Sequence, residues 1–321
     1  MSGAALDLEV LEARAETPLV RAIRLGRPDG GPLPSWQAGA HVKVVLPTGD
    51  ERSYSLVKTG GEGSHAPRAY RLGVRLDDPS EGGSRHMHCL RAGDRLRVGV
   101  PTNTFALEPG PGPTVLLAGG IGITPLLSMA AELAETGRPF RVHYAGRSRN
   151  QLPFLPEIEA LAGERLHVHA DDEAGGFFDV EGLLASLTGH ERLYVCGPTP
   201  MIDAVIAGAK ARGWTEGRLH FEHFGKTAPR ADDGAFEVVL QGSGRSFRIP
   251  PDRSILDVLI DAGLDPLHDC KRGDCAVCQV EVAEGVPDHR DFVLSDAEKA
   301  SNKLMQICVS RSKTPRLVIA L

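Results

Sequence analysis

Four cysteines near the C-terminal end constrain the fold of this chain more than any other feature. Cys270, Cys275, Cys278 and Cys308 follow the spacing C-x4-C-x2-C-x29-C. Three thiolates on one tight loop and a fourth from a distant segment can surround two irons, and this spacing is that of plant-type [2Fe–2S] sites. Gly273 allows the loop to bend inward and direct backbone amides at the sulfurs, where they stabilise negative charge. The spacing predicts that this segment folds around a metal centre.

A structural zinc ion is the alternative occupant of the same loop. Four-cysteine zinc sites usually combine two C-x2-C pairs, whereas here only Cys275 and Cys278 form such a pair. The spacing therefore favours the iron–sulfur cluster. A zinc-loaded redox-sensing or interaction module is the alternative from a different functional class.

The composition excludes several other classes of protein. The chain has 321 residues, of which 41% are hydrophobic and 24% charged, as in ordinary globular proteins of two or three domains. A net charge of −6 and 5% aromatic residues argue against a nucleic-acid partner. Charged residues from Asp7 onward predict no secretory leader, and glycines with Pro125 interrupt the longest apolar stretch. We expect a monomeric cytoplasmic protein without a membrane partner.

Hydrophobic periodicity divides the chain into three domains and a linker, a multidomain architecture. Residues 1–108 contain short alternating runs separated by Gly- and Pro-rich turns, typical of a small antiparallel β-barrel. Strands and helices alternate in residues 109–225, which predicts an α/β domain with a parallel sheet. Residues 226–234 are polar and predict a linker, and residues 235–321 predict an α+β domain. The expected barrel strands are Leu6–Ala13, Leu19–Arg24, His41–Leu46, Arg52–Val57, Ala69–Val74 and Arg95–Val100.

One predicted barrel strand carries side chains suited to a flavin. The sequence at residues 52–55 is Arg52, Ser53, Tyr54, Ser55, and strand alternation places Arg52 and Tyr54 on one face. A flavin requires a cation for its phosphate, an aromatic side chain beside its rings and a small donor near N5. Arg52, Tyr54 and Ser55 supply these three groups, although many strands carry such residues for packing alone.

A second motif in the same domain predicts an anion site. Gly82, Gly83 and Ser84 precede a predicted helix at residues 85–90, and free amides with a hydroxyl at a helix start bind anions. The helix itself contains His86, Met87, His88 and Cys89. Adjacent residues on a helix point in different directions, so we favour a packed helix face with Cys89 buried over a metal site.

Two turns of the α/β domain predict a dinucleotide site. Gly119, Gly120 and Gly122, followed by Thr124 and Pro125, join a strand to a helix, where glycines allow backbone to approach a pyrophosphate. Pro125 occupies the third glycine position of the Rossmann motif, so the turn is of another type.

The second turn, Cys196, Gly197 and Pro198, follows the next-to-last strand, at the edge where open α/β sheets bind ligands. A buried, inert Cys196 is the alternative interpretation.

Taken together, these motifs resemble those of the phthalate dioxygenase reductase family. The resemblance covers nearly the whole chain and includes the domain order, the paired motifs at residues 52–55 and 82–84, the turns at 119–125 and 196–198, and the four cysteines. His289, Arg290 and Asp291 match a further motif of the last domain. The resemblance implies a β-grasp ferredoxin domain, FMN rather than FAD, and NADH as the electron donor.

The resemblance also implies roles for individual residues. Ser55 is expected near flavin N5 and Cys196 beside the nicotinamide. Phe224 is expected against the flavin ring; the alternative is that the two aromatic residues of that segment are core residues. Two positions depart from the usual cysteine loop, Asp274 and Ala276, and we expect the charge of Asp274 to lower the cluster potential. The implied acceptor is a Rieske-type oxygenase, either a ring-hydroxylating dioxygenase or an O-demethylating monooxygenase.

Two alternatives stay open within the same chemistry. Arginines at residues 147–149 could accept the 2′-phosphate of NADPH, whereas Asp171 and Asp172 would repel it and favour NADH. FAD could replace FMN, and the acceptor could be a diiron monooxygenase or a cytochrome P450.

Overall fold

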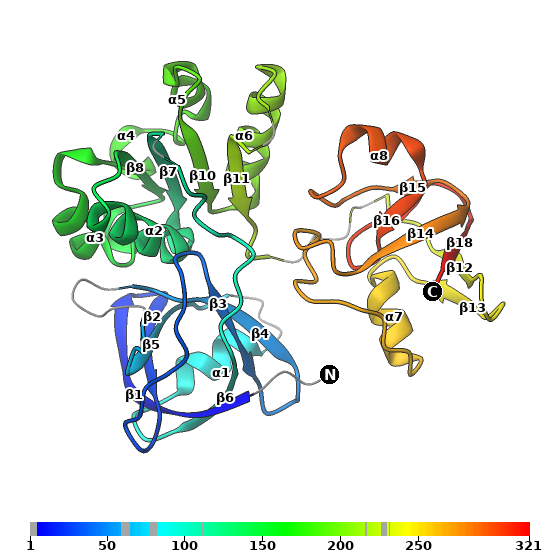
Figure 1. Ribbon diagram of the computed structural model, residues 1–321, viewed down its shortest axis with the longest axis horizontal. Coiled ribbons are helices and arrows are strands. Elements are labelled where there is room, and N and C mark those ends of the chain that lie inside the picture. The colour runs from blue at the N-terminus through cyan, green and yellow to red at the C-terminus, as the bar shows by residue number, and fades with distance from the viewer. Residues whose placement is uncertain are drawn as a thin grey trace. The chain divides into compact units, whose positions relative to one another are not determined.

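The computed structural model describes residues 5–58, 65–77, 82–110, 112–215, 217–225, 230 and 232–321 (Figure 1). The chain divides into two compact units, Met1–Glu222 and His223–Leu321. Most of the predicted linker at 226–234 lies outside the described residues. The predicted boundary between residues 108 and 109 stays a prediction, because the barrel and the parallel sheet belong to one compact unit.

The first unit begins with an antiparallel sheet in the order β4-β3-β6-β1-β2-β5. A bridge between Leu56 and Leu72 joins the segment after β4 to β5, so the two outer strands meet and the sheet closes around a core that includes Val42 and Met87. The predicted antiparallel barrel with its six strands is confirmed. The elements are β1 (Ala5–Thr17), β2 (Val20–Gly26), β3 (His41–Val45), β4 (Glu51–Ser55), β5 (Ala69–Arg75), α1 (Gly83–Cys89) and β6 (Arg95–Gly99).

A parallel sheet in the order β11-β10-β7-β8-β9 completes this unit. All residues of β7 are buried, as expected for a strand covered on both faces. The strand order reverses between β7 and β10, and ligands of open α/β sheets bind at such a switch point. The elements are β7 (Thr114–Gly119), η1 (Gly120–Gly122), α2 (Ile123–Glu135), β8 (Phe140–Gly146), η2 (Arg149–Gln151), α3 (Leu155–Ala162), η3 (Gly163–Arg165), β9 (Leu166–Ala170), α4 (Asp171–Ala174), α5 (Val180–Ser186), β10 (Arg192–Cys196), α6 (Thr199–Ala211) and β11 (Leu219–Glu222).

Alternation along β7 explains how the two sheets come to share a core. Val115 and Leu117 pack with side chains of α5 and α6, whereas Leu116 and Ala118 pack with α2 and α3 on the other face. The second cluster also contains residues of the barrel domain, among them Val57. The face of the parallel sheet that carries α2 is therefore the face that joins the barrel.

The second unit is built on a mixed sheet in the order β13-β12-β18-β14-β16, with a separate pair β15-β17. Helix α7 begins after Ser254, whose hydroxyl accepts from the Asp257 amide, and it buries Leu256 and Leu259 against the sheet. In the described part of the chain, no helix is long and apolar enough to cross a membrane. The elements are β12 (Phe236–Leu240), β13 (Ser246–Ile249), α7 (Ile255–Asp261), β14 (Gln279–Glu284), β15 (Pro287–Asp288), α8 (Asp296–Ser301), β16 (Leu304–Gln306), β17 (Arg311–Ser312) and β18 (Arg316–Ala320).

Asp233, at the end of the predicted linker, is tied into the second unit. Both of its carboxylate oxygens accept from the Arg290 guanidinium, and Arg311 Nε lies 3.7 Å away. The carboxylate is 4% exposed. The Arg290 hydrogen bonds lower the pKa of Asp233 to about 2, against the opposing effect of burial. The segment just before β12 is therefore anchored by charge.

Replacing Asp233 with Asn should destabilise the second unit by about 2 kcal/mol at neutral pH. The folded-state pKa lies below the unfolded value, so this stability is present above about pH 4 and lost as the pH falls toward 2. Urea unfolding of parent and variant, followed by circular dichroism across that pH range, measures the difference. The exposed neighbour Asp232→Asn is the control, and equal effects of the two changes would contradict the assignment.

Candidate functional site

The two predicted flavin motifs meet in the barrel domain. Arg52 on β4 packs over Gly83 at the start of α1: a Cβ added at Gly83 would lie 2.9 Å from Arg52 Cγ. Gly82, which precedes the helix, has a φ of 94°, a conformation that favours glycine. The guanidinium-bearing side chain and the helix start therefore share one corner of the barrel, as a phosphate site requires.

The remaining side chains of these motifs line the same region. Tyr54 packs against the barrel core, and burial raises its pKa to about 12, so the phenol is neutral at physiological pH. Ser55 is 6% exposed, and Ser53 pairs across the ladder with Lys43. The Ser84 hydroxyl accepts from the Asp77 amide at 3.2 Å.

The glycines of the predicted nucleotide turn divide into two kinds. A Cβ added at Gly122 would lie 2.1 Å from the Cys196 carbonyl oxygen, and one added at Gly119 would lie 2.4 Å from Pro198 Cδ. The two turns therefore press backbone against backbone, and Gly197 approaches Gly119 in the same way. Gly120 instead has a φ of +53° with nothing within 4 Å of an added Cβ. Gly120 is the glycine that faces open space.

Thr124 and Pro125 are buried within α2. The Thr124 hydroxyl donates to the Ile121 carbonyl at 3.0 Å, and its methyl group packs on Gly73 of β5, where an added Cβ would lie 2.7 Å away. Thr124 thus starts the helix and contacts the barrel. Direct cofactor contacts for these two residues stay predictions.

Tyr144, on β8, supports the nucleotide turn from below. The fully buried phenol lies 2.7 Å from the Pro153 carbonyl oxygen and 3.1 Å from that of Gly120. It holds the left-handed Gly120 peptide in place. Tyr144 was not predicted as a site residue, because an aromatic residue on an apolar strand is typical of a core position. The available signal was a tyrosine instead of a phenylalanine, since a buried hydroxyl needs a hydrogen-bond partner.

The carboxyl ends of β10 and β11 place Cys196 beside Glu222. The two residues are paired in register and both are buried. Phe224 follows in the second unit, about one-third exposed. Its predicted contact with the flavin stays a prediction, as do the roles of Ser55 and Cys196.

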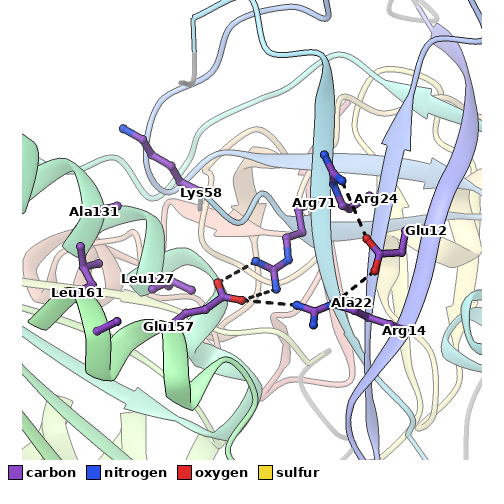
Figure 2. Close-up of a pocket in the computed structure, with 11 residues that line it drawn as sticks. Glu12, Arg14, Ala22, Arg24, Lys58, Arg71, Leu127, Ala131, Glu157 and Leu161 are labelled. Atoms are coloured by element: carbon purple, nitrogen blue, oxygen red, sulfur yellow. Dashed lines mark hydrogen bonds and ion pairs between the residues drawn. The ribbon is translucent and has the colours of Figure 1, made fainter. Parts of the chain in front are cut away.

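A cavity of about 580 Å³ lies between the barrel strands and helices α2 and α3 (Figure 2). Glu157 on α3 accepts two hydrogen bonds from Arg71 on β5, at 2.7 and 2.8 Å, and Figure 2 shows Arg14 reaching the same carboxylate. In Figure 2, dashed lines join arginines that line this cavity to carboxylates. These carboxylates offset the positive charge of the arginines. This network bridges the barrel and the nucleotide-binding domain.

The four predicted cluster ligands come together in the second unit. Neighbouring Cys275 and Cys308 thiols lower the pKa of Cys270, and Cys308 does the same to Cys278. Backbone amides of Arg272 and Asp274 point at Cys270 Sγ, at 3.3 and 3.4 Å. Four thiols linked through the pairs Cys270–Cys275, Cys270–Cys308 and Cys278–Cys308, together with inward amide donors, fit a [2Fe–2S] cluster.

The thiols contact one another in pairs. Among the described residues, no group of three or more His, Cys, Asp or Glu side chains has the arrangement that holds a single metal ion.

The backbone of the cysteine loop shows why a glycine is needed at position 273. Gly273 has a φ of +83°, and an added Cβ would lie 2.8 Å from Val309 and 3.1 Å from Asp291 Cα. Ala276 has a φ of 60° and Lys271 a φ of 54°, in the region that disfavours side chains. Asp274 lies 3.7 Å from Arg272 Nε, with both side chains largely buried. The guanidinium therefore offsets part of the charge expected to lower the cluster potential.

Two known domain families match the chain. The oxidoreductase NAD-binding domain matches residues 116–206, and the 2Fe-2S iron-sulfur cluster binding domain matches residues 238–313. The second match includes all four cysteines and supports iron–sulfur over zinc.

Curated relatives extend over nearly the whole chain. Tetrachlorobenzoquinone reductase from Sphingobium chlorophenolicum is 42% identical, covering 98% of this chain and 97% of its own. Vanillate O-demethylase oxidoreductase from Pseudomonas sp. (strain HR199 / DSM 7063) is also 42% identical, covering 92% and 93%. The structure of phthalate dioxygenase reductase matches with a TM-score of 0.75 and 35% identity, covering 99% of this chain and 98% of that one. The chain belongs to the phthalate dioxygenase reductase family. It is an oxidoreductase with an NAD-binding and a [2Fe–2S] domain.

Membership of the phthalate dioxygenase reductase family does not restrict the fold to separate reductases. An intact type IV self-sufficient cytochrome P450 monooxygenase matches 99% of this chain with a TM-score of 0.76 and 35% identity, and the match covers 41% of that longer chain.

One expectation for this member of the family was wrong. In α1 the buried side chain is Met87, whereas Cys89 is exposed. The seven-residue helix turns Met87 toward the barrel core, so Cys89 two residues later points away. His88 Nε2 lies 2.9 Å from the Val74 carbonyl oxygen, which gives this histidine a structural partner.

Replacing Ala276 with Gly should stabilise the second unit by about 0.5–1 kcal/mol, because glycine adopts a φ near +60° without steric cost. Ala300→Gly, inside α8, is the matched control and should destabilise by about 1 kcal/mol. Thermal unfolding of the cluster-loaded protein measures both. A lower midpoint for Ala276→Gly would show that the loop needs the alanine side chain.

Proposed function

We propose that this protein is the reductase component of an oxygenase system, passing electrons from NADH through FMN and the [2Fe–2S] cluster to a Rieske-type oxygenase. The observation that carries the proposal is the presence, in one chain, of a nucleotide turn joined to a flavin-type strand and a four-cysteine loop with inward amides. When bound, the flavin accepts the two electrons of a hydride and the cluster carries electrons singly.

Each group of side chains then has a proposed role in binding. Arg52, with Gly82, Gly83 and Ser84, holds the FMN phosphate, because the cation and the helix start share one corner. Neutral Tyr54 covers the ring edge, and Ser53 and Ser55 border it. On the nucleotide side, Gly120 offers open backbone to the pyrophosphate, while Gly119, Gly122 and Gly197 allow the two turns to meet. Cys196 and Pro198 border the nicotinamide, and Phe224 contacts the flavin ring. Cys270, Cys275, Cys278 and Cys308 hold the cluster.

The surroundings of Arg149 support NADH over NADPH. Arg149 lies 3.3 Å from Glu173 and 3.7 Å from Glu159, so its charge is already engaged. Three acids, including Asp171 and Asp172, occupy the first turn of α4. Carboxylates thus surround Arg149 at this edge, whereas Arg147 is exposed and makes no ion pair in the described part of the chain.

The acceptor is proposed from the relatives. Vanillate O-demethylase oxidoreductase supports an O-demethylating oxygenase as partner, and the match to a self-sufficient cytochrome P450 makes a P450 the second candidate. Reduction of each purified acceptor by NADH through this protein distinguishes them; the quinone reductase relative adds a quinone to the panel. We propose a monomer, which light scattering tests.

An anaerobic NADH titration tests the electron path. A flavin takes two electrons and the cluster one, so complete reduction should need about 1.5 NADH per chain. The Cys308→Ala variant, which retains the flavin but not the cluster, should need about 1.0. Mass spectrometry of the released flavin decides between FMN and FAD. A colourless protein that NADH leaves unchanged would refute the proposal.

Releasing Arg149 should shift coenzyme preference. We expect Glu173→Gln to raise kcat/KM for NADPH by about tenfold while changing that for NADH by less than twofold, since a freed guanidinium favours the 2′-phosphate. Steady-state reduction of ferricyanide measures both constants. Glu164→Gln, an exposed acid nearby in sequence, serves as the control, and a parallel gain there would point to overall charge instead.

A further inference from the structure

Ser128 lies where the nucleotide-binding helix meets the flavin strand. It is fully buried on α2. Its hydroxyl donates to the Leu56 carbonyl oxygen at 2.8 Å and accepts from the Lys58 amide at 2.8 Å. One hydroxyl therefore satisfies two main-chain groups of the barrel domain, directly after the proposed flavin residue Ser55.

Among the described residues, Ser128 takes the place that a neighbouring strand would fill beside Leu56 and Lys58. β4 pairs with β3 up to His41 and Ser55, and the Leu56 amide still donates to Ala40 at 2.8 Å. β3 does not extend past this pair, because His41 is its first residue. On the other side of the strand, the Val57 amide donates to the Arg71 carbonyl of β5. The Ser128 hydroxyl replaces the missing strand neighbour.

The same helix carries the nucleotide turn. Gly122 caps α2, and Thr124, one turn before Ser128 on the same helix face, packs on Gly73 of β5. Two contacts about one helical turn apart fix both the rotation of α2 about its axis and its position along that axis relative to the barrel. The path from the nucleotide turn to Ser55 runs through Ser128 and Leu56, all within one compact unit.

We propose that Ser128 is a positioning residue. It sets the nucleotide turn, residues 119–125, against the flavin strand β4 for hydride transfer. The proposal rests on the proposed function of the two cofactor sites. Hydride transfer depends steeply on the separation of the reacting atoms, so a small shift of α2 is expected to slow it greatly. A second link between the two domains is the ion pair of Arg71 on β5 with Glu157 on α3, which lies outside the Ser128 contact.

Rapid mixing of the anaerobic, flavin-loaded Ser128→Ala variant with NADH tests this. We expect the NADH dissociation constant to change by less than twofold and the limiting rate of flavin reduction to fall at least tenfold. With NADH deuterated at the transferred position, the variant should show a full primary isotope effect. Ser128→Thr, which keeps the hydroxyl, should restore most of the rate.

Hydrogen exchange gives a readout independent of activity. In the absence of NADH, peptides that contain Lys58 should exchange faster in Ser128→Ala than in the parent. Ser186→Ala is the matched control, because the Ser186 hydroxyl bonds only to Leu183 of its own helix among the contacts described; it should change neither the exchange nor the rate.

Two outcomes would overturn the proposal. One is a limiting rate within twofold of the parent in a folded Ser128→Ala protein. The other is an equal loss of rate in Glu157→Gln, which would show that any loosening between the domains slows reduction. If Ser128→Ala does not fold, Ser128→Cys, with a weaker hydrogen-bonding group of similar size, should reduce the rate by an intermediate factor, and a parental rate there would refute the role. A parent that NADH cannot reduce would refute the proposed function instead.

Discussion

The contact between the turns after β7 and β10 is the constraint on which the nucleotide-binding half of the molecule depends. Gly122 meets the Cys196 carbonyl and Gly119 meets Pro198 at distances that leave no room for a side chain. Because the two turns touch through backbone, the carboxyl ends of both strands open toward the same crevice. The Tyr144 hydroxyl also contacts the Gly120 carbonyl, which orients the peptide at the open face of the turn.

Much of the architecture could be predicted from periodicity and spacing. The period of two in the barrel strands, the alternation of strands with helices, and the four-cysteine pattern each follow from local chemistry that a sequence displays directly. The glycines of the nucleotide turn were also predicted as functional, but for an incomplete reason, the approach of a pyrophosphate. Gly119 and Gly122 are also required because two turns pack together there, from segments almost eighty residues apart in the chain.

The residues that sequence reasoning missed share a physical property. Ser128, Arg71 and Asp233 act through partners distant in the chain, and each looks ordinary in its own segment: a helical serine, a strand arginine and a linker acid. Their roles arise from burial beside a specific partner. The prediction for Cys89 was wrong for a different reason. Its burial was inferred from residue type alone, whereas α1 turns Met87 inward instead.

The anchoring of Asp233 has a consequence for how the protein behaves at high ionic strength. The Asp233 side chain is 4% exposed and that of Arg290 6%, and salt screens buried charge pairs much less than exposed ones. The segment just before β12 therefore stays anchored at salt concentrations that weaken exposed pairs such as Arg253 with Asp261.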